Sequence, residues 1–180
     1  MPRRRRQFSP LATLVVALFA GVVAWFSRDH LSESPPPTAI AGQVVAVIDG
    51  DTVGVMLNGS EARVRLHGID APEKSQPFGD RAKRDLSERV FGQVVQVDTV
   101  DRDRYGRVVG RIHLEGRDVN VEMVRAGLAW WYRQYAPDDA MLADAEREAR
   151  ADRRGLWQDS EPVAPWEWRR RSREGVSTGD

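Results

Sequence analysis

Three acidic side chains occupy positions from which they could hold and use a metal ion. Asp51 begins one predicted strand and Asp70 ends another, and a β-barrel can bring two such strand ends side by side. Carboxylate oxygens without histidine or cysteine partners suit Ca²⁺ or Mg²⁺, and Ca²⁺ also accepts main-chain carbonyls. Glu73 lies three residues beyond Asp70, close enough to hold a water molecule beside such a metal. The spacing therefore indicates a hard-cation site with one spare carboxylate.

Two arginines can converge on the same place. Arg65 lies five residues before Asp70 on the same predicted strand, and Arg107 arrives from a separate loop. A metal ion and guanidinium groups neutralise a phosphate and the charge that develops on it during reaction. A carboxylate can orient or deprotonate the attacking water. Together these groups are the parts needed to hydrolyse a phosphodiester.

Each of these residues also has a simpler structural interpretation. The stretch "DGDT" (49–52) can be a turn or bulge, and "DAPE" (70–73) fits a helix capping box with Asp70 as the cap. Arg65 can merely pair with a neighbouring carboxylate, and "DRDRYGR" (101–107) can be a polar loop. Taken separately these interpretations suffice, but they do not explain why all the groups occur in one chain.

Composition and charge narrow the chemistry further. The chain has 180 residues, 41% hydrophobic and 30% charged, which fits a soluble globular core. It has no cysteine, which excludes disulfides, thiolate zinc sites and a cysteine nucleophile. Residues 1–34 hold five Arg but only one Asp and one Glu, so the rest of the chain has 22 basic and 25 acidic side chains. A domain that bound nucleic acid by overall charge would be basic, so positive charge must be local to the site.

The elements that must position these residues form a small α+β domain. Short β-branched runs predict five strands, at residues 43–48, 52–57, 62–69, 93–100 and 107–114. In the third of them Val64 and Leu66 alternate with basic residues, so one face is apolar. Apolar residues at helical spacing predict three helices, at residues 77–92, 121–125 and 138–154. This order matches a five-stranded β-barrel of the OB-fold type (oligonucleotide/oligosaccharide-binding) with three packed α-helices.

The N-terminal residues have a different character. Residues 1–31 combine four consecutive arginines with an apolar run from Leu11 to Phe26, which predicts a hydrophobic helix. This helix is either a retained single-pass membrane anchor or a signal segment cleaved near "VVA" (22–24). We prefer the anchor because the apolar run is long and the cleavage site poor. Residues 32–40 form a stiff proline-rich linker to the domain.

The domain is expected to cover residues 41–160, and residues 161–180 form a C-terminal tail rich in Trp and Arg. We expect Trp166 and Trp168 to hold the tail on the domain. The arginines that follow are expected to be solvated at a flexible terminus.

Four motifs resemble the staphylococcal nuclease (thermonuclease) family, in that family's order and at about its spacing. They are "VIDGDTV", "RVRLHGIDAPE", "DRYGRVVGRI" and "VNVEMVRAGLA", and the resemblance covers roughly residues 42–158. It implies a barrel with three helices. It also implies an enzyme that cleaves DNA and RNA with Ca²⁺ as cofactor and leaves 3′-phosphorylated products.

The resemblance also implies roles for individual residues. It makes Asp51 and Asp70 the calcium carboxylates, Ala71 a main-chain carbonyl ligand and Glu73 the general base. It assigns phosphate binding to Arg65 and Arg107. It assigns support of the metal ligands to Asp49 and Thr52, and it places Tyr105 beside the nucleotide pocket.

Three departures from the family pattern affect these expectations. Position 71 is commonly threonine, and alanine keeps the carbonyl but loses a side-chain hydrogen bond. The segment "WWYRQY" (130–135) fits no single register, so no nucleotide contact is assigned to its tyrosines. Because the domain is acidic, it should bind duplex DNA weakly. We therefore expect a preference for single-stranded substrates, whose unpaired bases can stack on the protein.

The expected protein is thus a monomeric nuclease domain, exported and tethered to a bacterial-type cell membrane with the domain outside the cytoplasm. Cleavage of the signal would instead leave it secreted or periplasmic. The alternative function is a non-catalytic module on the same barrel that binds oligonucleotides or proteins. A degenerate module should have lost some of its charged groups, yet all five are present: Asp51, Arg65, Asp70, Glu73 and Arg107.

Overall fold

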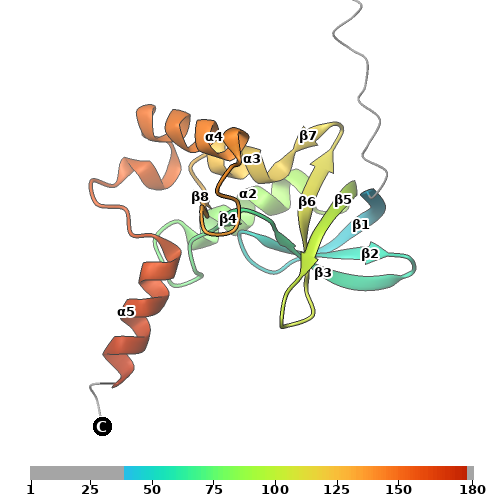
Figure 1. The fold of residues 1–180 in the computed structure, drawn as a ribbon, viewed down its shortest axis with the longest axis horizontal. Coiled ribbons are helices and arrows are strands. Elements are labelled where there is room, and N and C mark those ends of the chain that lie inside the picture. The colour runs from blue at the N-terminus through green and yellow to red at the C-terminus, as the bar shows by residue number, and fades with distance from the viewer. Residues whose placement is uncertain (1–38, 178–180) are drawn as a thin grey trace, which may run out of the picture. The chain divides into compact units, whose positions relative to one another are not determined.

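A computed structural model describes residues 39–177 and contains the predicted closed barrel (Figure 1). Its sheet runs in the order β3-β2-β1-β5-β6-β7, and a parallel pairing of β3 with β6 closes it. The strands are β1 (Ala39–Val47), β2 (Thr52–Leu57), β3 (Ser60–Leu66), β5 (Val94–Arg102), β6 (Val108–Leu114) and the short β7 (Arg117–Asp118). Neighbouring strands are otherwise antiparallel. The five predicted strands are therefore confirmed, with ends shifted by a few residues.

The third predicted strand is broken in two, and this break places Asp70. After β3, Gly68 has a left-handed backbone (φ 74°), and the chain continues as β4 (Ile69–Asp70). A Cβ at Gly68 would lie 2.7 Å from Leu142 Cδ1 and 2.9 Å from Ala136 Cβ, so only glycine fits both the conformation and the space. β4 then pairs antiparallel with β8 (Trp130–Trp131) in a separate two-stranded sheet.

The three predicted helices are present as α2 (Gly79–Val90), α3 (Val119–Arg125) and α4 (Ala140–Ala151). A short 3-10 turn, η1 (Gly155–Gln158), follows α4, and a further helix, α5 (Pro165–Ser177), follows η1. In Figure 1, α5 extends away from the other helices and from the barrel. The expectation of a flexible tail was wrong: most of that segment is helical.

The capping-box interpretation of "DAPE" is also wrong. Asp70 lies in β4, and the next helix begins only at Gly79, after a stretch without regular structure. Gly79 packs tightly against that stretch, since a Cβ there would lie 2.0 Å from the carbonyl oxygen of Glu73. The pairing of β4 with β8 outweighs the local capping pattern.

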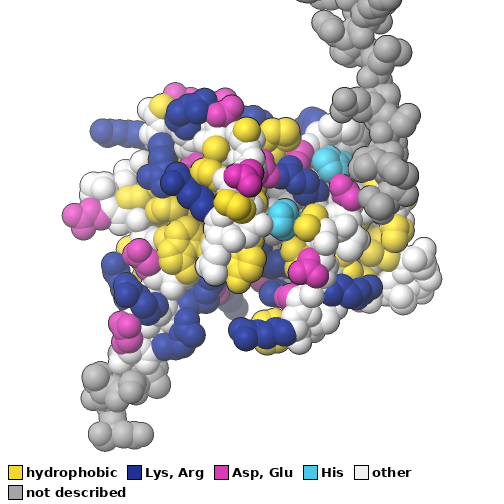
Figure 2. All heavy atoms as spheres, viewed as in Figure 1, with side chains coloured by type: hydrophobic (Ala, Val, Ile, Leu, Met, Phe, Trp, Pro, Cys, Tyr) yellow, Lys and Arg dark blue, Asp and Glu magenta, His cyan; other side chains and the backbone are white. Residues whose placement is uncertain are grey.

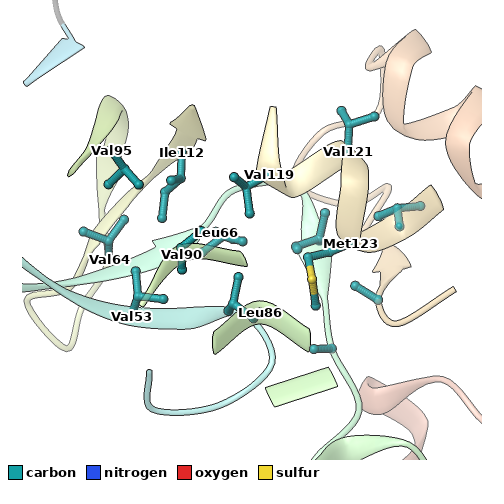
Figure 3. Close-up of a cluster of buried hydrophobic side chains, with 14 of the residues drawn as sticks. Val53, Val64, Leu66, Leu86, Val90, Val95, Ile112, Val119, Val121 and Met123 are labelled. Carbon is teal, nitrogen blue, oxygen red and sulfur yellow. The ribbon is translucent and has the colours of Figure 1, made fainter. Parts of the chain in front are cut away.

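A single main cluster of buried side chains joins the barrel to its helices. Figure 3 shows valines of the barrel strands, among them Val53 and Val64, close to Leu86 and Val90 of α2. Val64 and Leu66 are almost completely buried, so the predicted apolar face of the third strand is confirmed. Asn120 is a polar residue buried in this core, and its side chain links separate segments by hydrogen bonds. Its side-chain oxygen accepts from Ile112 N, and its nitrogen donates to the carbonyl oxygens of His67 and Gly110.

The N-terminal predictions, an anchor or signal over residues 1–31 and a linker over most of 32–40, lie outside the described residues. Within residues 39–177, none of the helices has both the length and the apolar character needed to cross a membrane.

Candidate active site

The loop between β1 and β2 is pressed against the start of the β4–α2 connection. A Cβ at Gly50 would lie 2.7 Å from Ala71 Cβ and 2.8 Å from Ala82 Cβ, so the loop approaches that closely only with glycine. Asp49 supports the turn, because its Oδ1 accepts from the backbone N–H of Asp51 at 3.0 Å. The two aspartates flanking Gly50 therefore have different surroundings, and Asp51 is the one that faces Ala71.

Asp51 uses both carboxylate oxygens inside the fold. Oδ2 accepts from the backbone N–H of Ala71 at 2.7 Å, and Oδ1 accepts from the hydroxyl of Thr52 at 3.1 Å. Oδ1 also pairs with Arg65 Nη1 at 3.1 Å. Asp51 is only 6% exposed. Burial raises the pKa of its carboxyl to about 7, although the charge of Arg65 acts in the opposite direction.

Asp70 is brought to the same place from β4. It is 1% exposed, and its Oδ1 accepts from Arg65 Nη2 at 2.9 Å. Arg65 thus bridges the two carboxylates from β3, one with each terminal nitrogen. Burial raises the pKa of Asp70 too, while hydrogen bonding and charge from arginines oppose that rise. Two buried acids and one cation form the centre of the site.

The third acid is linked to Asp70 by a residue that the sequence did not indicate. Arg169 of α5 donates from Nη1 to Glu73 Oε1 at 2.7 Å and to Asp70 Oδ1 at 3.2 Å, and from Nη2 to Asp70 Oδ2 at 2.8 Å. The expectation that the arginines of the tail are solvated is therefore wrong for Arg169. The tryptophans before it were the available signal, because they predicted that the tail packs on the domain, although they did not indicate which residues Arg169 contacts.

The second predicted phosphate arginine stands beside this centre rather than in it. Arg107 immediately precedes β6, which pairs with the strand that carries Arg65. Its Nε donates to Asp103 Oδ2 at 2.7 Å, and its guanidinium lies 5.7 Å from the ring centre of Tyr105, which is 71% exposed. Asp103 Oδ1 also accepts from the backbone N–H groups of Tyr105 and Arg107. Burial acts to raise the pKa of Asp103, but these hydrogen bonds outweigh it and lower that pKa.

An aromatic surface lies next to Asp70. Trp130, the β8 partner of Asp70, contacts Trp166 edge to face at 5.6 Å between ring centres, and Tyr132 stacks on Trp166 at 5.0 Å and 11°. These rings line an open pocket of about 440 Å³ together with two arginines, Arg133 and Arg150, and further polar side chains. Figure 2 shows hydrophobic side chains gathered where α5 begins, with basic side chains, all arginines, along the helix.

The donor set fits a hard cation with few protein ligands. Among residues 39–177, no group of three or more His, Asp or Glu side chains forms a metal-binding cluster. The expected ligands are instead two carboxylates, on Asp51 and Asp70, with the main-chain carbonyl of Ala71, the residue that follows Asp70. Guanidinium cations already contact both carboxylates, so this pair of acids attracts positive charge. All these donors are oxygen atoms, which suits Ca²⁺.

Comparison with known proteins agrees with this geometry. Residues 63–159 match the family described as Staphylococcal nuclease homologue. A micrococcal nuclease of Shigella flexneri is 42% identical over 146 residues, which cover 76% of this chain and 84% of the relative. An uncharacterized endonuclease of Escherichia coli is 47% identical over 133 residues (73% and 86%), and the Escherichia coli protein ParB is 46% identical over 150 residues (77% and 84%).

The loop geometry predicts that Asp103 holds Arg107 in place. In Asp103→Ala the backbone N–H groups of Tyr105 and Arg107 lose their acceptor, so we expect their hydrogen exchange to become about tenfold faster or more. Amide exchange measured by NMR on the two proteins checks this. Asp101→Ala is the control, since within the described residues the side chain of Asp101 accepts only from the neighbouring Arg102 N–H. Unchanged exchange at Tyr105 and Arg107 in Asp103→Ala would contradict the assignment.

Proposed function

Since this chain belongs to the staphylococcal nuclease homologue family and is a nuclease, we propose that it hydrolyses phosphodiester bonds of DNA and RNA in a Ca²⁺-dependent reaction. The observation that carries the proposal is the bridge from Arg65 to Asp51 and Asp70, with Glu73 linked to the same Asp70. It gathers a hard-cation donor set, a phosphate-binding cation and a spare carboxylate within one site.

In this proposal Asp51 and Asp70 would hold the Ca²⁺ through carboxylate oxygens, and Ala71 would hold it through its main-chain carbonyl. The loss of threonine at position 71 leaves that carbonyl in place. Asp49 and Thr52 support the proposal by fixing the loop and one oxygen of Asp51. When bound, the cation neutralises a phosphate oxygen and makes the phosphorus easier to attack.

The side chains of the protein then have distinct tasks. Glu73 accepts the proton of the attacking water, as a general base or as the group that orients it. Arg65 and Arg107 donate hydrogen bonds to the phosphate oxygens, which carry more negative charge in the transition state than in the substrate. Tyr105 stands at the edge of the nucleotide pocket, under the guanidinium of Arg107. Attack on phosphorus breaks the bond to the 5′ oxygen, which takes a proton from solvent, and leaves a 3′-phosphate and a 5′-hydroxyl.

The decisive experiment combines a chelator with one isosteric substitution. The purified full-length protein should cleave single-stranded DNA with Ca²⁺ and lose this activity in EDTA. Glu73→Gln should reduce turnover by about 10²- to 10⁴-fold, the range for loss of general acid–base catalysis. Glu115→Gln, at an exposed glutamate in the turn between β6 and β7, is the control and should leave the rate unchanged.

Full activity of a folded Glu73→Gln would remove Glu73 from the reaction. Absence of cleavage by the folded wild-type protein in Ca²⁺ would favour the alternative, a non-catalytic binding module.

We also propose that single strands are the preferred substrate. Residues 35–180 have more acidic than basic side chains, so attraction to duplex DNA is weak. Trp130, Tyr132 and Trp166 beside Asp70 line an open pocket, in which unpaired bases can contact aromatic rings. Base stacking is worth about 1–3 kcal/mol per base, so we expect roughly tenfold faster cleavage of single strands than of duplex at physiological salt. Equal rates on matched single-stranded and duplex oligonucleotides would refute the preference.

The final proposal is export and membrane tethering by residues 1–31. It is supported by the sequence of that segment alone, four arginines followed by an apolar run. Mass spectrometry of the membrane fraction should find the intact N-terminus, starting at residue 1 or 2. A mature chain beginning near Trp25 would instead indicate a cleaved signal and a secreted or periplasmic protein.

A further inference from the structure

The guanidinium of Arg169 binds the carboxylates of Asp70 and Glu73. In the proposed function Asp70 is a metal ligand and Glu73 is the general base. The guanidinium spans both oxygens of Asp70, at 3.2 and 2.8 Å, and reaches Glu73 Oε1 at 2.7 Å. Charge-assisted pairs of this forked kind are the stronger class of hydrogen bond. Arg169 is half-buried, with 36% of its side chain exposed, so water weakens the pairs less than at a fully exposed site.

The position of Arg169 follows from how α5 is held. Trp166, three residues earlier and so on the same helical face, packs between Tyr132 and Trp130. Just before the helix, the carbonyl oxygen of Val163 accepts from Gln76 Nε2 at 2.6 Å. Gln76 Oε1 in turn accepts from the backbone N–H of Glu73 at 3.2 Å. The segment that carries Glu73 and the start of α5 are therefore tied together, which directs Arg169 to the site.

Arg169 and a divalent cation cannot both bind the two carboxylate oxygens of Asp70 at the same time. Asp70 is 1% exposed, and a carboxylate so deeply buried needs a positive partner. A metal ion coordinated by Asp70 would lie close to a guanidinium bound to the same two oxygens, and like charges at such distances repel strongly. Arg65 differs in this respect, because it binds only one oxygen of Asp70. Occupation of Asp70 by the metal therefore requires Arg169 to withdraw from it.

We propose that Arg169 competes with the divalent cation for Asp70, so that α5 sets the cation concentration at which the site fills. This inference rests on the proposed function, in which Asp70 is a metal ligand. Arg169 serves as the positive partner of Asp70 and Glu73 in the metal-free protein and is displaced from Asp70 on binding. The C-terminal helix thus determines the metal affinity of the site. This helix lies outside the family match, which covers residues 63–159.

The test is calcium binding to the full-length protein without nucleic acid. Arg169→Gln removes the competitor, so its calorimetric Kd for Ca²⁺ should be about 3- to 10-fold lower than that of the wild type. Arg170→Gln is the matched control: it removes the same charge from the next residue of α5, which is exposed and makes no ion pair within the described residues. Its Kd should stay within about twofold of the wild type, because the lost charge acts on the site only at long range.

A Kd of Arg169→Gln equal to or higher than that of Arg170→Gln would overturn the role of Arg169 and leave the proposed nuclease intact. Absence of Ca²⁺ binding in all three proteins would overturn both proposals. Arg169→Lys is a second variant that keeps the charge but not the fork, and its Kd should lie between those of the wild type and Arg169→Gln. Melting temperatures without metal check folding, and Arg169→Gln should gain more from added Ca²⁺ than Arg170→Gln does.

Discussion

The candidate site depends on one cation between two buried carboxylates. Asp51 and Asp70 are almost completely removed from water, and each would be costly as an isolated anion. Arg65 contacts both, so the three groups form a unit whose geometry fixes the distance between the carboxylates. Everything around the unit serves this arrangement: β3 carries Arg65, β4 carries Asp70, and the turn at Gly50 brings Asp51 against Ala71.

The barrel and the first three helices could be predicted because local patterns specify them. Alternation in β3 and helical spacing in α2 and α4 are properties of short stretches, and the structure keeps them. The break at Gly68 was missed because the apolar pattern continues through it. At the break Gly68 lies close to Ala136 and Leu142, from a distant part of the chain, and a local pattern does not show this approach. The capping pattern at Asp70 failed for the same reason, since β8 pairs there.

The sequence predicted those residues of the site that lie close together in the chain. Asp51, Arg65, Asp70 and Glu73 fall inside a short segment, and the expected meeting of Asp51, Arg65 and Asp70 is confirmed by their contacts. Arg169 could not be found in this way, because nothing near it in the sequence indicates its partners. The packing of Trp166 on Tyr132 and Trp130, and the hydrogen bond from Gln76 to Val163, direct it to Asp70 and Glu73. An arginine in a charged terminal run resembles a solvated one until its helix is placed.

The order in which these residues leave the ribosome adds a consequence. Chains are made from the N-terminus and tend to fold in that direction. The carboxylates, Arg65 and all five barrel strands are therefore synthesised well before α5, which carries Arg169. The nascent chain can assemble its acidic centre while α5 is still missing. Arg169 can thus reach that centre only after α5 has been synthesised, and a chain terminated before α5 would keep the acids without it.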